Sequence, residues 1–406
     1  MIRKSEKMKS NLPSVLGKSR LRFDITLSLD LPRKEIMEDL LRDLNNKNND
    51  SEDIDSLFVP DQKFKTAREL VRDADLPDFD SLKWVAFSQT DFLLENKRTD
   101  RDEKKELFRA SGLKDLLATG LVIYAPRAGS FLKMFFIGDY KPVIEMADII
   151  VTSKLQNKDY DLDWNAFSPD PYLDYSSGIN NIGTPISKVN QFYDDFVGQK
   201  LYSGQDGTGK LTRENLLWMV SNPQIRAEVS FTDQKDNKRD INPNFCIGLL
   251  DRLNYMSYGV LRKDVIKCYS LLVGMIASTQ IGGVGILEIP TPNCPAMDGI
   301  VGLFSTFFSR LHVIKLKQDT MDNDTVYLLG SSFNKNPNES GSQPIYPIDK
   351  LKSYVEFLSQ EDKFYPVLSF MSKRVKSFHD ELNIVMTNPL KTQVNRLLDT
   401  WPSRNI

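Results

Sequence analysis

Apolar residues recur at helical spacing, three or four positions apart, in several separated stretches of the chain. The clearest stretch is 298–311, whose apolar face consists of Ile300, Leu303, Phe304, Phe307 and Phe308. An earlier stretch, 33–44, is amphipathic in the same way. The pattern predicts helices over 33–44, 101–117, 262–280, 298–311, 348–359 and 365–385, and a further helix that begins after Thr212.

Short apolar runs bounded by turn residues lie between these predicted helices. Segment 121–124 is apolar, 228–233 alternates in the manner of a strand, and 284–289 is a third run. Two last runs, 313–316 and 326–329, are close enough in sequence to pair antiparallel. The alternation of strands and helices predicts an α/β fold whose mainly parallel sheet ends in an antiparallel hairpin.

Polar segments and glycines separate the regular elements. Gly204 and Gly209 bound a glycine-rich stretch just before Thr212, a favourable N-cap, so a tight turn is expected at a helix entrance. The aromatic-rich region 161–202 before it is expected to be irregular. The acidic, Asn-rich tract 43–55 is too polar to be buried and is expected to be a mobile loop.

These boundaries predict three regions. An N-terminal appendage with the mobile acidic loop is expected over 1–99, and the α/β domain over 100–335. The stretch 334–344 is rich in turn residues and predicts a linker. A helical C-terminal extension is expected over 336–406.

Composition narrows the classes of function. Lys and Arg number 53 and Asp and Glu number 55, so contact with nucleic acid would need a local basic patch rather than a general positive field. Three cysteines without CxxC spacing and two histidines argue against a zinc site or a disulfide framework. They favour a reducing, intracellular and cytoplasmic location. No apolar run is long enough to span a membrane, so no membrane contact is expected.

Five short motifs, each with glycines or acids at turns, follow one another between residues 124 and 327. They occupy 124–131, 206–211, 229–234, 282–288 and 315–327. In this order they resemble the motifs of the FtsJ-like, Adrift-type cap 2′-O-methyltransferases of eukaryotes and large DNA viruses. The resemblance covers roughly 100–335. It implies a Rossmann-type methyltransferase fold, S-adenosylmethionine as the cofactor, no metal, and RNA as a partner.

The resemblance also implies which residues would form the site. The cofactor turn corresponds to Pro126, Gly129 and Phe131, and Asp163 is an acid that would reach the cofactor ribose. The family's catalytic Lys-Asp-Lys-Glu set corresponds in order to Lys104 or Lys105, Asp233, Glu288 and Asp324. An amine of lowered pKa among other charges suits this chemistry, because it can take the proton of a ribose hydroxyl.

Two departures from the family pattern shape the functional hypothesis. Arg127 and a single glycine, Gly129, stand where the family has a glycine pair, so weak or absent cofactor binding is expected. Glu288 stands where the family has its central lysine, and it should lie at the carboxyl edge of its strand near Asp233. The chain is therefore expected to be a catalytically degenerate member that acts as a structural or stimulatory subunit with the capping or transcription machinery.

Three considerations bear on that hypothesis. The final strands and C-terminal helices are similar to those of the degenerate small subunit of poxvirus capping enzymes. An active cap 2′-O-methyltransferase with a rearranged site is one alternative. A non-enzymatic RNA-binding or virion protein that keeps the sheet as a scaffold is the other.

Several of these residues also have purely structural interpretations. Glu288 fits a solvated strand-end residue better than a site residue. Gly282 is as well explained by a helix C-cap as by a site. The aromatic residues Trp164, Phe167, Tyr172 and Tyr175 fit core packing better than base stacking. Lys373, Arg374 and Lys376 fit the solvated face of a helix better than an RNA or partner surface.

Overall fold

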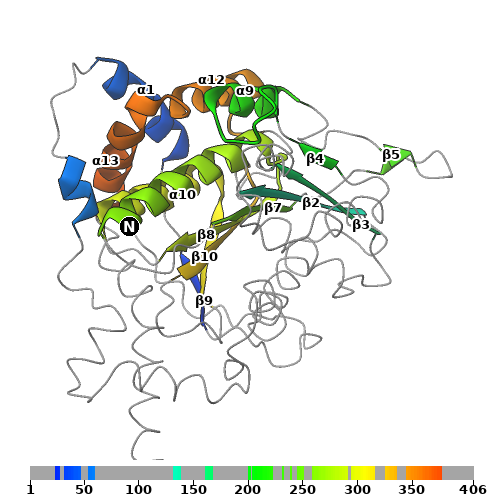
Figure 1. Ribbon diagram of the computed structural model, residues 1–406, viewed down its shortest axis with the longest axis horizontal. Helices are drawn as coiled ribbons and strands as arrows, with labels where there is room; N and C mark the ends of the chain where they lie inside the picture. Colours follow the sequence, from blue (N-terminus) through cyan, green and yellow to red (C-terminus); the bar gives the residue numbers. More distant parts are fainter. Residues whose placement is uncertain are drawn as a thin grey trace, which may run out of the picture.

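An eight-stranded mixed sheet forms the centre of the protein in the computed structural model (Figure 1). Its strand order is β1-β9-β10-β8-β7-β2-β3-β4. The structure describes residues 23–27, 32–46, 54–59, 131–138, 161–167, 200–202, 204–222, 231–232, 238–239, 245–250, 258–290, 294–315, 325–335 and 344–376.

Five neighbouring strands make up the parallel part of the sheet. They are β2 (Phe131–Gly138), β3 (Asp161–Phe167), β4 (Lys200–Tyr202), β7 (Phe245–Leu249) and β8 (Val284–Pro290). Every residue of β7 is buried, as expected for a strand inside a parallel sheet with a continuous apolar sequence. The mainly parallel α/β architecture is therefore present, and the region 161–202 contains two of its strands rather than being irregular throughout.

The antiparallel part of the sheet lies beyond β8. β10 (Thr325–Ser331) pairs antiparallel with both β8 and β9 (Arg310–Lys315), which confirms the predicted hairpin. The sheet does not end at this hairpin, because β1 (Phe23–Leu27) pairs antiparallel with β9 and forms the last strand.

Of the strand predicted over 228–233, the structure describes residues 231–232, which lie outside the main sheet. β5 (Phe231–Thr232) pairs with β6 (Lys238–Arg239) in a separate two-stranded sheet. The strand that pairs with β2 on the side facing β8 is β7. β7 is the stronger candidate on physical grounds, because its unbroken apolar run can be buried on both faces.

Two helices lie directly on the sheet. α10 (Tyr258–Ser278) connects β7 to β8 and packs on β8, β7 and β2. α11 (Pro295–Phe307) connects β8 to β9 and packs beside α10. α9 (Arg213–Ser221) and α12 (Ile348–Leu358) pack on the side of α10 away from the strands (Figure 1). The helices predicted over 262–280, 298–311 and 348–359 are confirmed with small shifts in their ends.

The described parts of both end regions belong to the same body as the sheet. α1 (Arg33–Asn46) and α13 (Phe364–Val375) pack against α11, and η1 (Ile54–Phe58) lies between α11, α13 and α10. η2 (Glu361–Lys363) joins α12 to α13. The Arg374 guanidinium is 2.9 Å from a carboxylate oxygen of Asp39, which links α13 to α1. Together with β1, these contacts place both end regions on one continuous hydrophobic core.

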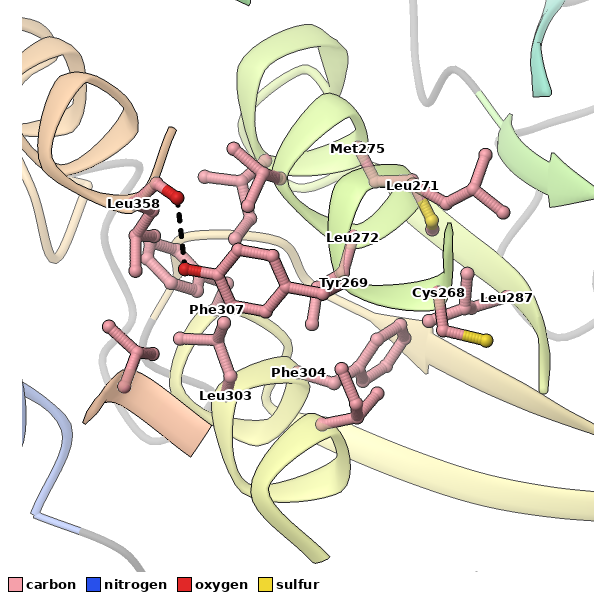
Figure 2. Close-up of a cluster of buried hydrophobic side chains, with 14 of the residues drawn as sticks. Cys268, Tyr269, Leu271, Leu272, Met275, Leu287, Leu303, Phe304, Phe307 and Leu358 are labelled. Atoms are coloured by element: carbon pink, nitrogen blue, oxygen red, sulfur yellow. Dashed lines mark hydrogen bonds between the residues drawn. The ribbon is translucent and has the colours of Figure 1, made fainter. Parts of the chain in front are cut away.

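Aromatic side chains of α11 fill the space between the helices and the sheet. The rings of Phe304 and Phe308 stack with their centroids 4.3 Å apart. Glycines in the strands make room for these rings, since a Cβ on Gly330 would overlap the Phe304 ring and a Cβ on Gly285 would overlap the Phe308 ring. Figure 2 shows Phe304 and Phe307 facing α10, where the Tyr269 hydroxyl donates a 2.9 Å hydrogen bond to the Leu358 carbonyl.

The three cysteines, Cys246, Cys268 and Cys294, are buried and free. They contribute small apolar side chains to the core rather than a disulfide framework. Among the helices that the structure describes, none has the length and apolar character needed to cross a membrane.

Candidate active site

The order of the parallel strands defines where a ligand would be expected. From β2 the chain continues to β3 and β4 on one side, and it returns at β7 on the other side of β2. In open α/β sheets, ligands bind outside the carboxyl ends of the strands at such a reversal of strand order. Gly138 ends β2 and Leu249 ends β7, so these residues mark the candidate site.

Glu288 lies at this carboxyl edge, one strand further along. Leu287 is in register with Gly248, so Glu288 is level with the last residue of β7. The Glu288 carboxylate accepts a 3.2 Å hydrogen bond from the backbone N–H of Leu250, which follows β7 directly. Glu288 is therefore level with the carboxyl end of β7, while the expected nearness to Asp233 falls on a residue outside the described ranges. The interpretation of Glu288 as a solvated residue is wrong, because the residue is only 5% exposed.

A turn of α10 brings a second carboxylate close to Glu288. Cys268 donates a 3.7 Å hydrogen bond through Sγ to the Glu288 carbonyl, and Asp264 lies one turn earlier on the same helix face. Burial raises the pKa of Asp264; the positive charge of Lys267 opposes this shift, and the negative charge of Glu288 adds to it. Asp264 Oδ1 is buried and makes no hydrogen bond within the part of the chain that the structure describes. The edge therefore holds two carboxylates, and the charge of Glu288 disfavours the ionised form of Asp264.

Replacing Asp264 by asparagine is expected to stabilise the folded protein at neutral pH. The folded state raises the pKa of this carboxyl, so folding is favoured while the group is protonated. That stability is lost as the pH rises above the unfolded-state value of about 3.9 and through the folded-state pKa. The Asp264→Asn side chain cannot ionise, so this variant should keep the stability that wild type loses as the pH rises. The midpoint of its urea unfolding at pH 7 should therefore be higher, and its stability should depend less on pH above about 4.

A matched substitution at the surface separates this effect from a change in net charge. Glu361 is exposed on η2, so Glu361→Gln removes one negative charge away from the sheet. This control should leave the unfolding midpoint at pH 7 almost unchanged. An Asp264→Asn variant that is less stable than wild type at pH 7 would mean that interactions in the folded protein outweigh the cost of burying the Asp264 carboxylate.

The residues expected to bind the cofactor do not gather at this edge in the described structure. Phe131, expected in a turn, is the first residue of β2 and lies at the amino edge, roughly 20 Å along the strand from the carboxyl end. Asp163 is the third residue of β3 and is in register with Lys133, also nearer the amino edge. Pro126, Gly129, Lys104, Lys105, Asp233 and Asp324 lie outside the described residues.

Gly282 and the turn around it have a structural role. The residue follows α10 with a φ of 81°, a conformation that glycine adopts without strain. Its N–H donates a 2.7 Å hydrogen bond to the Phe333 carbonyl, and the N–H of Gly283 donates to the Gln280 carbonyl at 2.8 Å. The glycine pair therefore forms a turn in the connection from α10 to β8, and Gly282 lies four residues after the last helical residue, Ser278, rather than at a helix C-cap.

Two further groups agree with their structural interpretations. Phe167 is fully buried and its ring packs against Trp218 of α9, with centroids 6.4 Å apart. On α13, Arg374 pairs with Asp39 and lies 4.9 Å from the centroid of the Phe370 ring. That arginine is engaged in joining helices rather than presented as a free cation.

Sequence reasoning missed Asp264 as a neighbour of Glu288. The available signal was the apolar run 245–250, which is bounded by Asn244 and Asp251 and fits a strand buried on both faces. If that run is identified as a strand, the helix that follows it must begin at the carboxyl edge of the sheet. Asp264, which lies near the start of that helix, is then placed at the same edge. No pattern in the sequence indicates that Glu288 would bond to the N–H of Leu250, because that contact depends on the relative register of β7 and β8.

Within the described ranges, no group of three or more His, Cys, Asp or Glu side chains is arranged to hold a metal ion. Comparison with known proteins adds no relative. No family model matches the chain, and no curated protein is significantly similar to it in sequence.

Proposed function

We propose that this protein is a methyltransferase-type α/β protein that has lost catalysis. We further propose that it serves as a structural or stimulatory subunit of an RNA cap-processing assembly. The proposal rests on the motif resemblance described above, on the strand order, and on the chemistry of the carboxyl edge. The last of these carries the most weight.

The strand order supports the fold part of the proposal. The parallel series β4-β3-β2-β7-β8 has the doubly wound order of nucleotide-binding sheets. The antiparallel β10, inserted between β8 and β9, adds the hairpin that methyltransferase sheets of the resembled type carry. Outside this series, β1 adds an edge strand to the sheet, and α1 and α13 extend the core.

The buried carboxylate of Glu288 is the main support for the proposed loss of catalysis. The resembled enzymes need an amine at this position to take the proton of the ribose hydroxyl. In this chain the position holds a carboxylate that accepts a hydrogen bond from Leu250, and a second carboxylate, Asp264, lies close by. Glu288 supplies no amine at the strand position that the resemblance gives to the lysine. Lys267, whose charge acts on Asp264, belongs to α10 and not to that strand position.

Assays of the purified full-length chain test the loss of catalysis. Wild-type protein, incubated with labelled S-adenosylmethionine and capped RNA that lacks 2′-O-methylation, is expected to transfer no methyl group. Isothermal titration calorimetry should show weak or no binding of S-adenosylmethionine. Micromolar affinity together with a methylation signal that Lys104→Ala or Lys105→Ala abolishes would show an active enzyme with a rearranged site.

The subunit part of the proposal needs a different measurement. A complex isolated from the native source through a tag on this chain is expected to methylate capped RNA, although the chain alone does not. Glu288→Gln in the tagged chain should leave that activity intact, since the residue has no catalytic role in this proposal. A tagged complex without any cap-modifying activity would remove the capping assignment, while the results on the isolated chain would still decide the question of catalysis.

A further inference from the structure

The loop between β4 and α9 matches a calcium-binding loop in its length, its glycine and the start of its following helix, but it is closed from within. In helix-bordered calcium loops of twelve residues, positions 1, 3, 5, 7, 9 and 12 supply the ligands and position 6 is glycine. The segment from Gly204 to Asn215 has the same length. Its sixth residue, Gly209, has a φ of 64°, and α9 begins at the tenth residue, Arg213.

Oxygen atoms at the ligand positions converge as they would around a cation. Asp206, at position 3, accepts hydrogen bonds from the Thr208 hydroxyl at 2.7 Å and from the Thr212 hydroxyl at 2.9 Å. Those residues hold positions 5 and 9. The seventh residue, Lys210, turns its backbone carbonyl toward the side chain of Asn215, the twelfth.

The Asn215 amide fills the centre of the loop. Its Nδ2 donates to Asp206 Oδ1 at 2.7 Å and to the Lys210 carbonyl at 2.8 Å, while its Oδ1 accepts from the Asp206 N–H at 3.2 Å. Asn215 is completely buried. The first position is Gly204, and a Cβ placed there would overlap the Asn215 amide. Positions 1 and 12, which carry acids in such calcium loops, therefore hold a glycine and an amide that fit against each other.

We propose that the side-chain amide of Asn215 takes the place of a bound cation, so that this calcium-type loop is a latch that closes without metal. The two N–H groups of the amide satisfy the same carboxylate and carbonyl oxygens that a divalent cation would bind. The absence of an acid at positions 1 and 12 leaves Asp206 as the only carboxylate at a ligand position, which is too little charge for a tight calcium site.

The charge state of Asp206 agrees with this arrangement. Partial desolvation alone would raise its pKa, but the hydrogen bonds from Thr208, Asn215 and Thr212 outweigh that effect and lower the pKa to about 2. The carboxylate is thus fully provided with donors in the absence of metal.

The latch fixes the start of α9 against the rest of the protein. Leu211, between two ligand positions, packs on α10 next to Gly274. Arg213, the first residue of α9, forms a 2.7 Å ion pair with Glu356 of α12. Opening the loop should therefore loosen α9 from α10 and α12, and thermal unfolding of the full-length chain should report it.

The test exchanges the amide for a carboxylate of the same shape. Asn215→Asp removes both N–H donors and sets a second negative charge beside Asp206. In EDTA the melting temperature of this variant should fall by roughly 5 °C. Millimolar calcium chloride should restore most of the lost melting temperature, since the loop of the variant then offers two carboxylates to the cation. Wild-type protein should melt at the same temperature in EDTA and in calcium.

Two further variants separate cation binding from general destabilisation. Asn215→Ala should also lower the melting temperature, but calcium should not restore it. Asp206→Asn added to Asn215→Asp should abolish the calcium response. A calcium-dependent rise in the melting temperature of wild type would show a native metal site and overturn the proposal. So would an Asn215→Asp variant that is as stable as wild type, or one that is destabilised but indifferent to calcium.

Discussion

Replacing Phe304 by alanine is expected to lower the free energy of unfolding by about 3–5 kcal/mol, as is typical when a large aromatic side chain is removed from a core. Phe304 is fully buried, and its ring stacks on Phe308 above the space left by Gly330. The strand carrying Gly330 is held on both sides by its neighbours, so the sheet cannot collapse into the cavity. Equilibrium urea unfolding of the full-length chain measures the change.

Phe370→Ala is the matched control for this prediction. Phe370 lies on α13, is only partly buried, and lies beneath the Arg374 guanidinium. Its removal should lower the free energy of unfolding by less than about 2 kcal/mol, because neighbouring side chains and water can fill the space. Equal losses for the two variants would contradict the placement of Phe304 at the centre of the core.

The helices were predictable from sequence because their burial pattern is local. The face of Ile300, Leu303, Phe304 and Phe307 is apolar at helical spacing, and all four side chains are buried. Thr212 was predictable as an N-cap for the same reason, and its hydroxyl accepts the N–H of Asn215 as expected. Such features depend on residues only a few positions apart.

Strands were predicted less well because their identity depends on distant partners. Segment 161–167 alternates polar and apolar residues, a strand signal that its aromatic content obscured. Segment 228–233 alternates as clearly, yet its described residues, Phe231–Thr232, form a strand that lies outside the main sheet. Alternation indicates a strand but does not say which strand will be its neighbour, so the place of β7 beside β2 could not be derived.

In the candidate site, too, features that depend on distant residues could not be predicted from the sequence. The resemblance implied that Glu288 lies at the carboxyl edge near Asp233, and the residue is level with the end of β7, while Asp233 lies outside the described residues. Its burial, its bond to Leu250 and its repulsion by Asp264 all depend on how β7, β8 and α10 are set against one another. Those relations join residues 24 or more positions apart, and no local pattern encodes them.

Glu288→Ala is expected to lower the free energy of unfolding by about 1–3 kcal/mol, because it leaves the buried N–H of Leu250 without its acceptor. Glu288→Gln is the matched control. Its side-chain oxygen can still accept from Leu250, and the loss of the negative charge relieves the repulsion with Asp264. The glutamine variant should remain within about 1 kcal/mol of wild type in urea unfolding at pH 7.

Combining Glu288→Gln with Asp264→Asn tests whether the two acids act on each other. If they repel in the folded protein, neutralising either one removes the shared penalty, so the second substitution should gain less than it does alone. The double variant should then be less stable than the sum of the single effects predicts. Additive effects would mean that the charges are screened from one another, and an alanine variant as stable as wild type would mean that Glu288 does not hold the N–H of Leu250. Either result would remove the paired carboxylates from the argument that this edge has lost the amine chemistry of a methyltransferase.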